Sequence, residues 1–223
     1  DRDSHGRFGR VIIETLEISA GAAGLKALTS RALSLDEDAS ARIDDRGDGT
    51  LDIFVTTPFD CFAARRVRGT VSRDKAVVAA KDVDAALADG RTEIGPARDS
   101  RWPGALPPSE GFVERDVVPV AVVRDLADQG RRLARQFSGP LGPPRSLLNQ
   151  TVLTVDSEQE TGGSAVEVPM RMIFTCTSLG LIPGPGAPVE LPRHLRIATA
   201  GRWVRMDAPF GSVYHSTALN LLF

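Results

Sequence analysis

The first half of the chain alternates short apolar segments with turn-forming residues. Three such segments follow one another, at residues 51–55, 62–71 and 76–80. Asp45, Gly47 and Gly49 precede the first of them, and Asp and Gly tolerate the positive φ that tight turns need. The pattern predicts a meander of antiparallel strands. Residues 11–18 alternate only in part and fit either a strand or the first turns of a helix.

The second half opens on an amphipathic segment and returns to strands. Val123, Leu126, Leu133 and Phe137 recur at helical spacing after Pro119, which predicts a helix over 119–137. The remaining elements are predicted as strands at 151–155 and 166–176, a hairpin tip at 156–164, a proline-rich loop at 183–192, a closing hairpin over 195–197 and 203–206, and the start of a helix over 213–223.

The two halves have a similar make-up. Each holds about three predicted strands with helices attached, which indicates an internal pseudo-repeat. Residues 90–119 contain five prolines and few apolar side chains, as is typical of a connection. We therefore expect one unit over 1–223, with pseudo-halves 11–90 and 119–223 joined by a proline-rich connection at 91–118. Residues 1–10 are polar and are expected to fray.

Composition excludes some classes of protein and leaves others open. The chain has 223 residues, of which 42 % are hydrophobic and 25 % charged, as in folded globular proteins. No apolar segment approaches the 18 residues of a membrane span. The first residues do not show a basic segment followed by an apolar one, so we expect no signal peptide. We therefore expect a cytoplasmic protein. A net charge of −2, without a concentrated basic segment, does not favour nucleic acid as a partner.

The sequence contains few residues in patterns typical of catalysis or of metal or cofactor binding. Cys61 and Cys176 lie 115 positions apart, which suits two reduced, buried thiols better than a disulfide or a metal site. Acidic clusters lack the spacing of a calcium loop, and no carboxylate pair or phosphate-binding glycine loop stands out. We predict no catalytic residues, no metal and no cofactor. The alternative is a small-ligand or acyl-binding α/β protein, a class that includes an enzyme using Cys61.

Three stretches resemble the EspG family, the cytosolic chaperones of type VII (ESX) secretion in mycobacteria and related actinobacteria. The first is LDIFVTTPFDCFAARRVRGTVSRDKAVVAAK at 51–81, and the second is LARQFSGPLGPPRS at 133–146. The third runs over 201–222, where Gly201-Arg202-Trp203-Val204 and Pro209 precede a predicted helix. The resemblance implies a single EspG-like domain of α/β (α+β) class. Its central antiparallel β-sheet would be flanked by helical bundles, with quasi-two-fold symmetry between two related halves.

The resemblance also implies a function. The protein would be a non-enzymatic cytosolic chaperone that binds PE–PPE heterodimer secretion substrates and keeps them soluble. The candidate partner-binding residues are Leu126, Leu133 and Phe137 on the predicted helix 119–137, together with Trp203 and Tyr214 near the sheet. Large apolar side chains such as these belong to the core more often than to an interface. A third reading is a regulator or structural remnant of the same fold, and the oligomeric state stays open.

Overall fold

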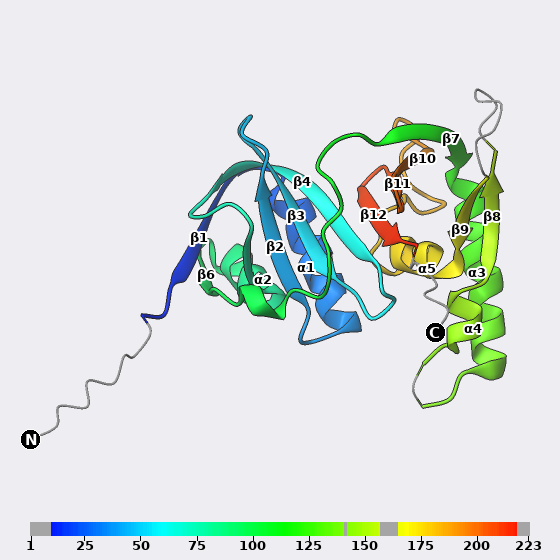
Figure 1. The fold of residues 1–223 in the computed structure, drawn as a ribbon, viewed down its shortest axis with the longest axis horizontal. Coiled ribbons are helices and arrows are strands. Elements are labelled where there is room, and N and C mark those ends of the chain that lie inside the picture. The colour runs from blue at the N-terminus through cyan, green and yellow to red at the C-terminus, as the bar shows by residue number, and fades with distance from the viewer. Residues whose placement is uncertain (1–9, 141, 157–164, 218–223) are drawn as a thin grey trace, which may run out of the picture.

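The computed structural model describes residues 10–140, 142–156 and 165–217. The first half begins with a strand, a helix and four further strands (Figure 1). Its elements are β1 (Ile13–Ala20), α1 (Ala22–Leu35), β2 (Ser40–Asp45), β3 (Thr50–Thr56), β4 (Phe62–Val71), β5 (Ala76–Ala79), α2 (Ala80–Asp89) and β6 (Glu93–Pro96). Gly47 and Gly49 adopt positive φ in the β2–β3 turn, as the sequence predicts.

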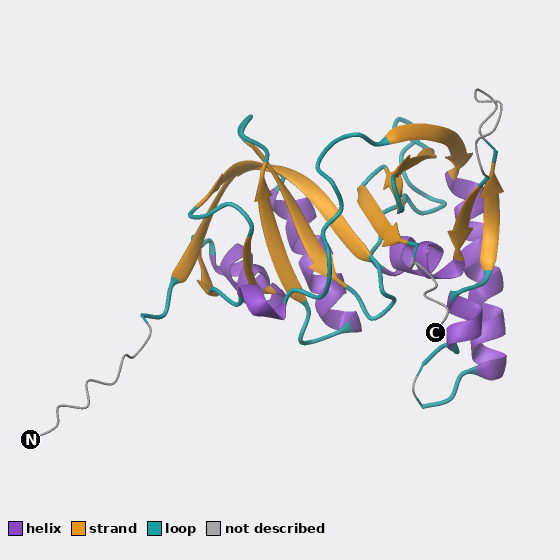
Figure 2. Cartoon of the chain, in the orientation of Figure 1, coloured by secondary structure: helices purple, strands orange, loops and turns teal. Residues whose placement is uncertain are grey.

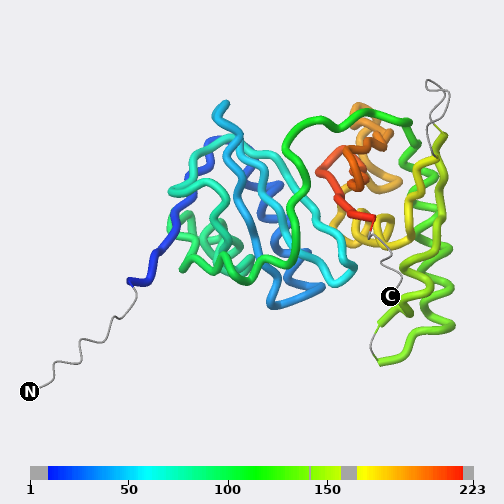
Figure 3. The backbone as a smooth tube through the Cα atoms, viewed as in Figure 1, coloured from blue at the N-terminus to red at the C-terminus, as the bar shows by residue number. Residues whose placement is uncertain are grey.

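The second half again begins with a strand followed by a helix. Its elements, after the short 3-10 helix η1 (Asp99–Arg101), are β7 (Val113–Pro119), α3 (Val120–Phe137), α4 (Arg145–Leu148), β8 (Thr151–Val155), β9 (Val166–Pro169), α5 (Met170–Ser178), β10 (His194–Ala200), β11 (Trp203–Ala208) and β12 (Gly211–Ser216). Figure 3 follows the chain from β6 across to β7, through the segment that we call the connector, residues 97–112.

One antiparallel sheet runs through both halves. Its main path has the order β5-β2-β3-β4-β12-β11-β10-β7, and β1 and β6 extend it from β4. The halves join where β12 pairs with β4, with Val213 opposite Ala63 and Tyr214 opposite Phe62. Strands β8 and β9 form a separate pair. The predicted α+β fold with a central antiparallel sheet is therefore confirmed.

The two faces of this sheet have different coverings. One face is covered by helices, α1 and α2 in the first half and α3 and α5 in the second (Figure 2). Alternate strand residues such as Ile53, Met206 and Ile197 point into that core and are fully buried. The opposite face, which we call the outer face, carries an aromatic cluster. Its members are Phe54, Trp203 and Tyr214, with Phe62, Trp102 and Phe112 packed against them.

Two predicted elements are wrong. Residues 166–176 were expected to form one strand, but β9 ends at Pro169 and helix α5 follows, with Met170 to Cys176 all buried. A segment that is apolar on every side carries no helical period, so its pattern cannot separate a strand from a buried helix. The helix expected over 213–223 is wrong where the structure describes it, because β12 runs to Ser216 as a strand.

Other predictions hold or lie beyond the description. The strands at 51–55, 62–71, 76–80 and 151–155, the helix at 119–137 and the hairpin turning at Gly201 are confirmed. Of residues 11–18, those from Ile13 onward belong to a strand, β1. Residues 1–9, the hairpin tip from 157 to 164 and residues 218–223 lie outside the described residues. No helix in the described part of the chain is long and apolar enough to cross a membrane.

Candidate functional site

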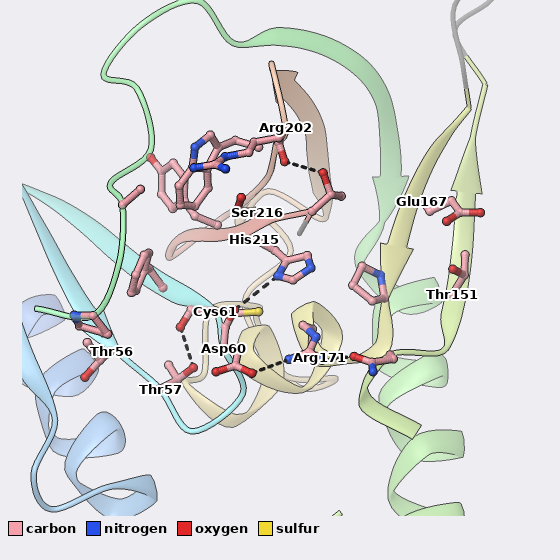
Figure 4. A pocket seen from close by; sticks show the side chains of 18 residues that line it. Thr56, Thr57, Asp60, Cys61, Thr151, Glu167, Arg171, Arg202, His215 and Ser216 are labelled. Atoms are coloured by element: carbon pink, nitrogen blue, oxygen red, sulfur yellow. Dashed lines mark hydrogen bonds and ion pairs between the residues drawn. The ribbon is translucent and has the colours of Figure 1, made fainter. Parts of the chain in front are cut away.

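A cavity of about 740 Å³ opens where the two halves meet, at the ends of strands β3, β4, β11 and β12 (Figure 4). We call it the junction cavity. Its lining comes from the β3–β4 turn, the connector, β8, β9, α5 and the last residues of β12. The residues are Thr56, Thr57, Asp60, Cys61, Phe62, Pro103, Ala105, Asn149, Thr151, Glu167, Pro169, Arg171, Arg202, Trp203, Tyr214, His215, Ser216 and Thr217.

Arg171 is the charged centre of this cavity. It occupies the first turn of α5, directly after Pro169 and Met170, and its side chain is only 10 % exposed. The guanidinium donates to the Phe59 carbonyl at 2.7 Å, to the Asp60 carboxylate at 3.3 Å and to the side-chain oxygen of Asn149. A buried charge is tolerated only when it is paired and hydrogen-bonded, and these contacts meet that need. Arg171 thereby ties the second half to the β3–β4 turn of the first.

The β3–β4 turn is built tightly around the same point. Asp60 adopts a positive φ of 55°, which is uncommon for a residue other than glycine. The Thr57 hydroxyl donates to the Cys61 carbonyl at 2.7 Å and closes the turn. His215 places Nδ1 3.4 Å from the Asp60 carbonyl, and burial lowers the pKa of its imidazole. The β3–β4 turn of the first half and strand β12 of the second half therefore meet at Asp60.

The cavity contains a cysteine but not an activated one. Cys61 is buried, and burial raises the pKa of its thiol to about 12, although the Thr175 hydroxyl and the Arg171 charge act in the opposite direction. Burial raises the pKa of Cys176 to about 12 as well. A thiol with such a pKa supplies almost no thiolate at neutral pH. The buried, free thiols predicted from the sequence are confirmed, and the geometry does not favour Cys61 as a nucleophile.

The structure sorts the candidate partner-binding residues into two places. Trp203 and Tyr214 are buried, belong to the outer-face aromatic cluster and line the junction cavity. Leu133 and Phe137 lie at the far end of α3, 39 % and 68 % exposed, where they border an apolar depression beside Pro144 and Leu147. Leu126 is partly buried against the core. Their role in partner binding stays a prediction.

Sequence reasoning missed the residues that hold the junction together. Arg171 and Asp60 were not candidates, because the fold brings them together from sequence positions more than 100 residues apart. One signal was present. Arg171 is the one charged residue within the apolar segment 168–176, and a charge in a buried segment requires partners.

A second feature is the charge of the helix layer. The five described α-helices carry nine Arg and Lys side chains against five Asp, although the whole chain has a net charge of −2. In the first half Lys26 is paired with Asp84 at 3.1 Å. The excess lies in the second half, where Arg131, Arg132 and Arg135 are exposed on α3 and Arg145 is exposed on α4.

Two family models match the chain, and each covers one half. A model described as domain of unknown function DUF8185 matches residues 107–220, which is just over half of the chain. A model described as domain of unknown function DUF8010 matches residues 15–104. No curated protein matches the sequence significantly.

Solved structures of bacterial sliding clamps share the fold. The chain aligns with the pol III beta protein of Caulobacter crescentus at a TM-score of 0.55 and 12 % identity, covering 91 % of this chain and 64 % of that one. For the DnaN sliding clamp (DNA polymerase III subunit beta) of Bartonella birtlesii, bound to griselimycin, the TM-score is 0.57 at 12 % identity, covering 94 % and 66 %. The DNA polymerase sliding clamp of Pseudomonas aeruginosa gives 0.55 at 12 % identity, covering 95 % and 66 %.

These likenesses show the fold alone, and the chain spans just under two thirds of the length of these clamp chains. They nevertheless correct the function inferred from the sequence. The secretion-chaperone function, the PE–PPE partners and the exclusion of nucleic acid are contradicted, because the structural neighbours are DNA sliding clamps. The net charge of −2 is a sum over the whole chain, in which acidic residues elsewhere outweigh the excess of Arg and Lys on the helices. The resemblance to EspG itself stays untested.

Proposed function

This chain belongs to the family described as domain of unknown function DUF8185, and we propose that it is a clamp-like, non-enzymatic protein that holds duplex DNA against its helix layer. The single observation that carries the proposal is the exposed basic end of α3, where three arginines fall within five residues. The shared fold with sliding clamps supports it. We place this activity in the cytoplasm.

The basic end of α3 has the chemistry of a phosphate-contacting surface. Arg131 is held by Asp128 at 3.2 Å, whereas no ion pair joins Arg132 or Arg135 to a carboxylate among the described residues. Arg145 begins α4, which packs against α3. Exposed guanidiniums bind phosphate oxygens without reading sequence and release condensed counterions on binding. The contact would therefore be independent of sequence and would weaken steeply with added salt.

The opposite face is less suited to DNA. The connector crosses it, and its aromatic side chains Trp102 and Phe112 pack on the sheet. On the helix layer, the arginines at the end of α3 are exposed and accessible to the phosphates of a DNA backbone. We therefore assign duplex contact to the helix layer of the second half.

Fluorescence anisotropy of a labelled duplex of about 20 base pairs tests the proposal. Arg132→Glu with Arg135→Glu should weaken binding by about tenfold or more at low salt, because two phosphate contacts become repulsive. The matched control is Arg68→Glu with Arg101→Glu, which changes the net charge equally at two exposed residues away from α3. Equal loss in both variants, or no binding by the wild type at about 50 mM salt, would overturn the proposal.

A further inference from the structure

The outer face carries a second cleft that the proposed DNA contact does not use. It has a volume of about 610 Å³ and lies beside the aromatic cluster. Its walls are strands β3, β4, β10, β11 and β12, the turn at Pro209 and Phe210, and Ser109 of the connector. It forms where the edge of β4 passes from its pairing with β12 at 62–64 to its pairing with β1 at 68–71. We call it the arginine cleft.

Five arginines line the arginine cleft against two aspartates. They are Arg46, Arg65, Arg66, Arg196 and Arg205, with Asp52 and Asp207. Strand register explains how Arg66, Arg196 and Arg205 converge, because residues pointing to the outer face stand opposite one another on neighbouring strands. Asp52 is opposite Arg66, and Asp207 is opposite both Arg196 and Ser212. In a chain of net charge −2, this is a local concentration of positive charge drawn from both halves.

The two carboxylates do not neutralise the cleft. Asp52 accepts hydrogen bonds from Arg66 at 2.7 and 3.0 Å and forms an ion pair with Arg46 at 3.1 Å. One carboxylate is therefore shared by two guanidiniums. Arg65 donates to the Phe210 carbonyl at 3.0 Å. Arg196 is 69 % exposed and lies 3.7 Å from Glu114, outside the lining of the cleft. Positive charge therefore remains available to a ligand.

The same contacts hold the guanidiniums in place. Arg205 is 2.9 Å from Asp207 and lies over the Phe112 ring at 4.3 Å from its centroid. Beside it, Tyr214 contributes a hydroxyl, and burial raises the pKa of that phenol to about 12, so it stays a donor at neutral pH. Side chains ordered before binding lose less entropy when a ligand arrives. The aspartates thus act as positioning groups for the arginines.

From this arrangement we infer that the arginine cleft binds a small ligand carrying a chain of phosphate groups. Planar guanidiniums match phosphate oxygens in bidentate fashion, and several of them in one cleft favour a multiply charged anion over a single carboxylate. A cavity of this size takes a small molecule. Both a free oligophosphate and a nucleoside triphosphate carry such a chain of phosphate groups. The inference rests on the outer face and is independent of the DNA contact at α3.

Isothermal titration of the full chain with tripolyphosphate, and separately with ATP, tests the inference. Arg196→Gln and Arg66→Gln should each weaken binding of tripolyphosphate by about fivefold or more, since each removes charged hydrogen bonds. Arg68→Gln is the matched control, two residues along β4 from Arg66 and outside the cleft. Ser109→Lys adds a charge on the exposed connector and should tighten binding.

The outcomes separate the two ligand sources and the two faces. Equal affinity for both probes identifies the phosphate chain as the recognised group, and tighter binding of ATP identifies a nucleotide. Arg132→Glu with Arg135→Glu should leave either affinity unchanged while weakening DNA binding, so the two proposals fail separately. No binding of either probe at about 10 mM, or equal losses in Arg66→Gln and Arg68→Gln, would overturn the inference.

Discussion

The guanidinium of Arg171, in the second half, donates a hydrogen bond of 2.7 Å to the backbone carbonyl of Phe59, in the first half. The rings of Phe59 and Phe174 lie beside this contact, with centroids 6.2 Å apart. Helix α5 is therefore anchored on the β3–β4 turn by one charged and one apolar contact. The pairing of β4 with β12 joins the two halves within the sheet, and Arg171 joins them a second time through α5 and the β3–β4 turn.

Replacing Arg171 with Met should destabilise the protein by about 2–4 kcal/mol, because the Phe59 carbonyl and the Asn149 side chain lose a charged donor. The measurement is urea unfolding followed by circular dichroism. Arg202→Met is the control, since Arg202 lines the same cavity but is exposed, and it should cost less than about 0.5 kcal/mol. If the two variants lost equal stability, the anchoring role of Arg171 would be wrong.

Phe137 should prove dispensable for folding. Its ring is 68 % exposed at the end of α3, so Phe137→Ala should change the free energy of unfolding by less than about 0.5 kcal/mol. Ile173→Ala in α5 removes a fully buried side chain and should cost about 2–5 kcal/mol. Thermal melts of both variants make the comparison. A large loss of stability in Phe137→Ala would place that ring in the core and contradict the exposed position.

Alkaline pH should destabilise the protein through its buried thiols. In the unfolded chain Cys61 and Cys176 lose their protons near pH 9, whereas burial raises the pKa of both to about 12 in the folded state. Their contribution to stability is therefore complete below pH 9 and is lost as the pH rises toward 12. Urea unfolding between pH 8 and pH 11 should show a steeper decline for the wild type than for Cys61→Ala with Cys176→Ala. An equal decline in both would refute the assignment.

The sequence predicted the elements whose pattern is local. The β2–β3 hairpin has a turn signal at Gly47 and Gly49, and α3 has one apolar and one charged face, so both were found. Helix α5 was taken for a strand because Met170 to Cys176 are buried on every side and show no period of 3.6. Pro169 is the last residue of β9, an edge strand of the two-stranded sheet, and directly precedes the first turn of that helix.

The candidate site was harder to predict than the fold. Trp203 and Tyr214 were placed near the sheet and do line the junction cavity, but Arg171 and Asp60 were not foreseen. Their meeting depends on the pairing of β4 with β12, about 150 residues apart, and no local pattern encodes that register. The arginine cleft depends on the same pairing. The net charge of the chain likewise did not indicate the excess of Arg and Lys on the helices, which lie far apart in the sequence.

The most direct test of the central claim is photo-crosslinking of the full chain to duplex DNA from one residue on each face. A benzophenone amino acid replaces Gln136 on α3 or Thr70 on β4, both of which are exposed. If duplex DNA contacts α3, residue 136 should give crosslinks whose yield falls with added salt, and residue 70 should give few, because the phosphate contacts come from the helix layer. Crosslinks mainly from residue 70, or from neither residue, would contradict it.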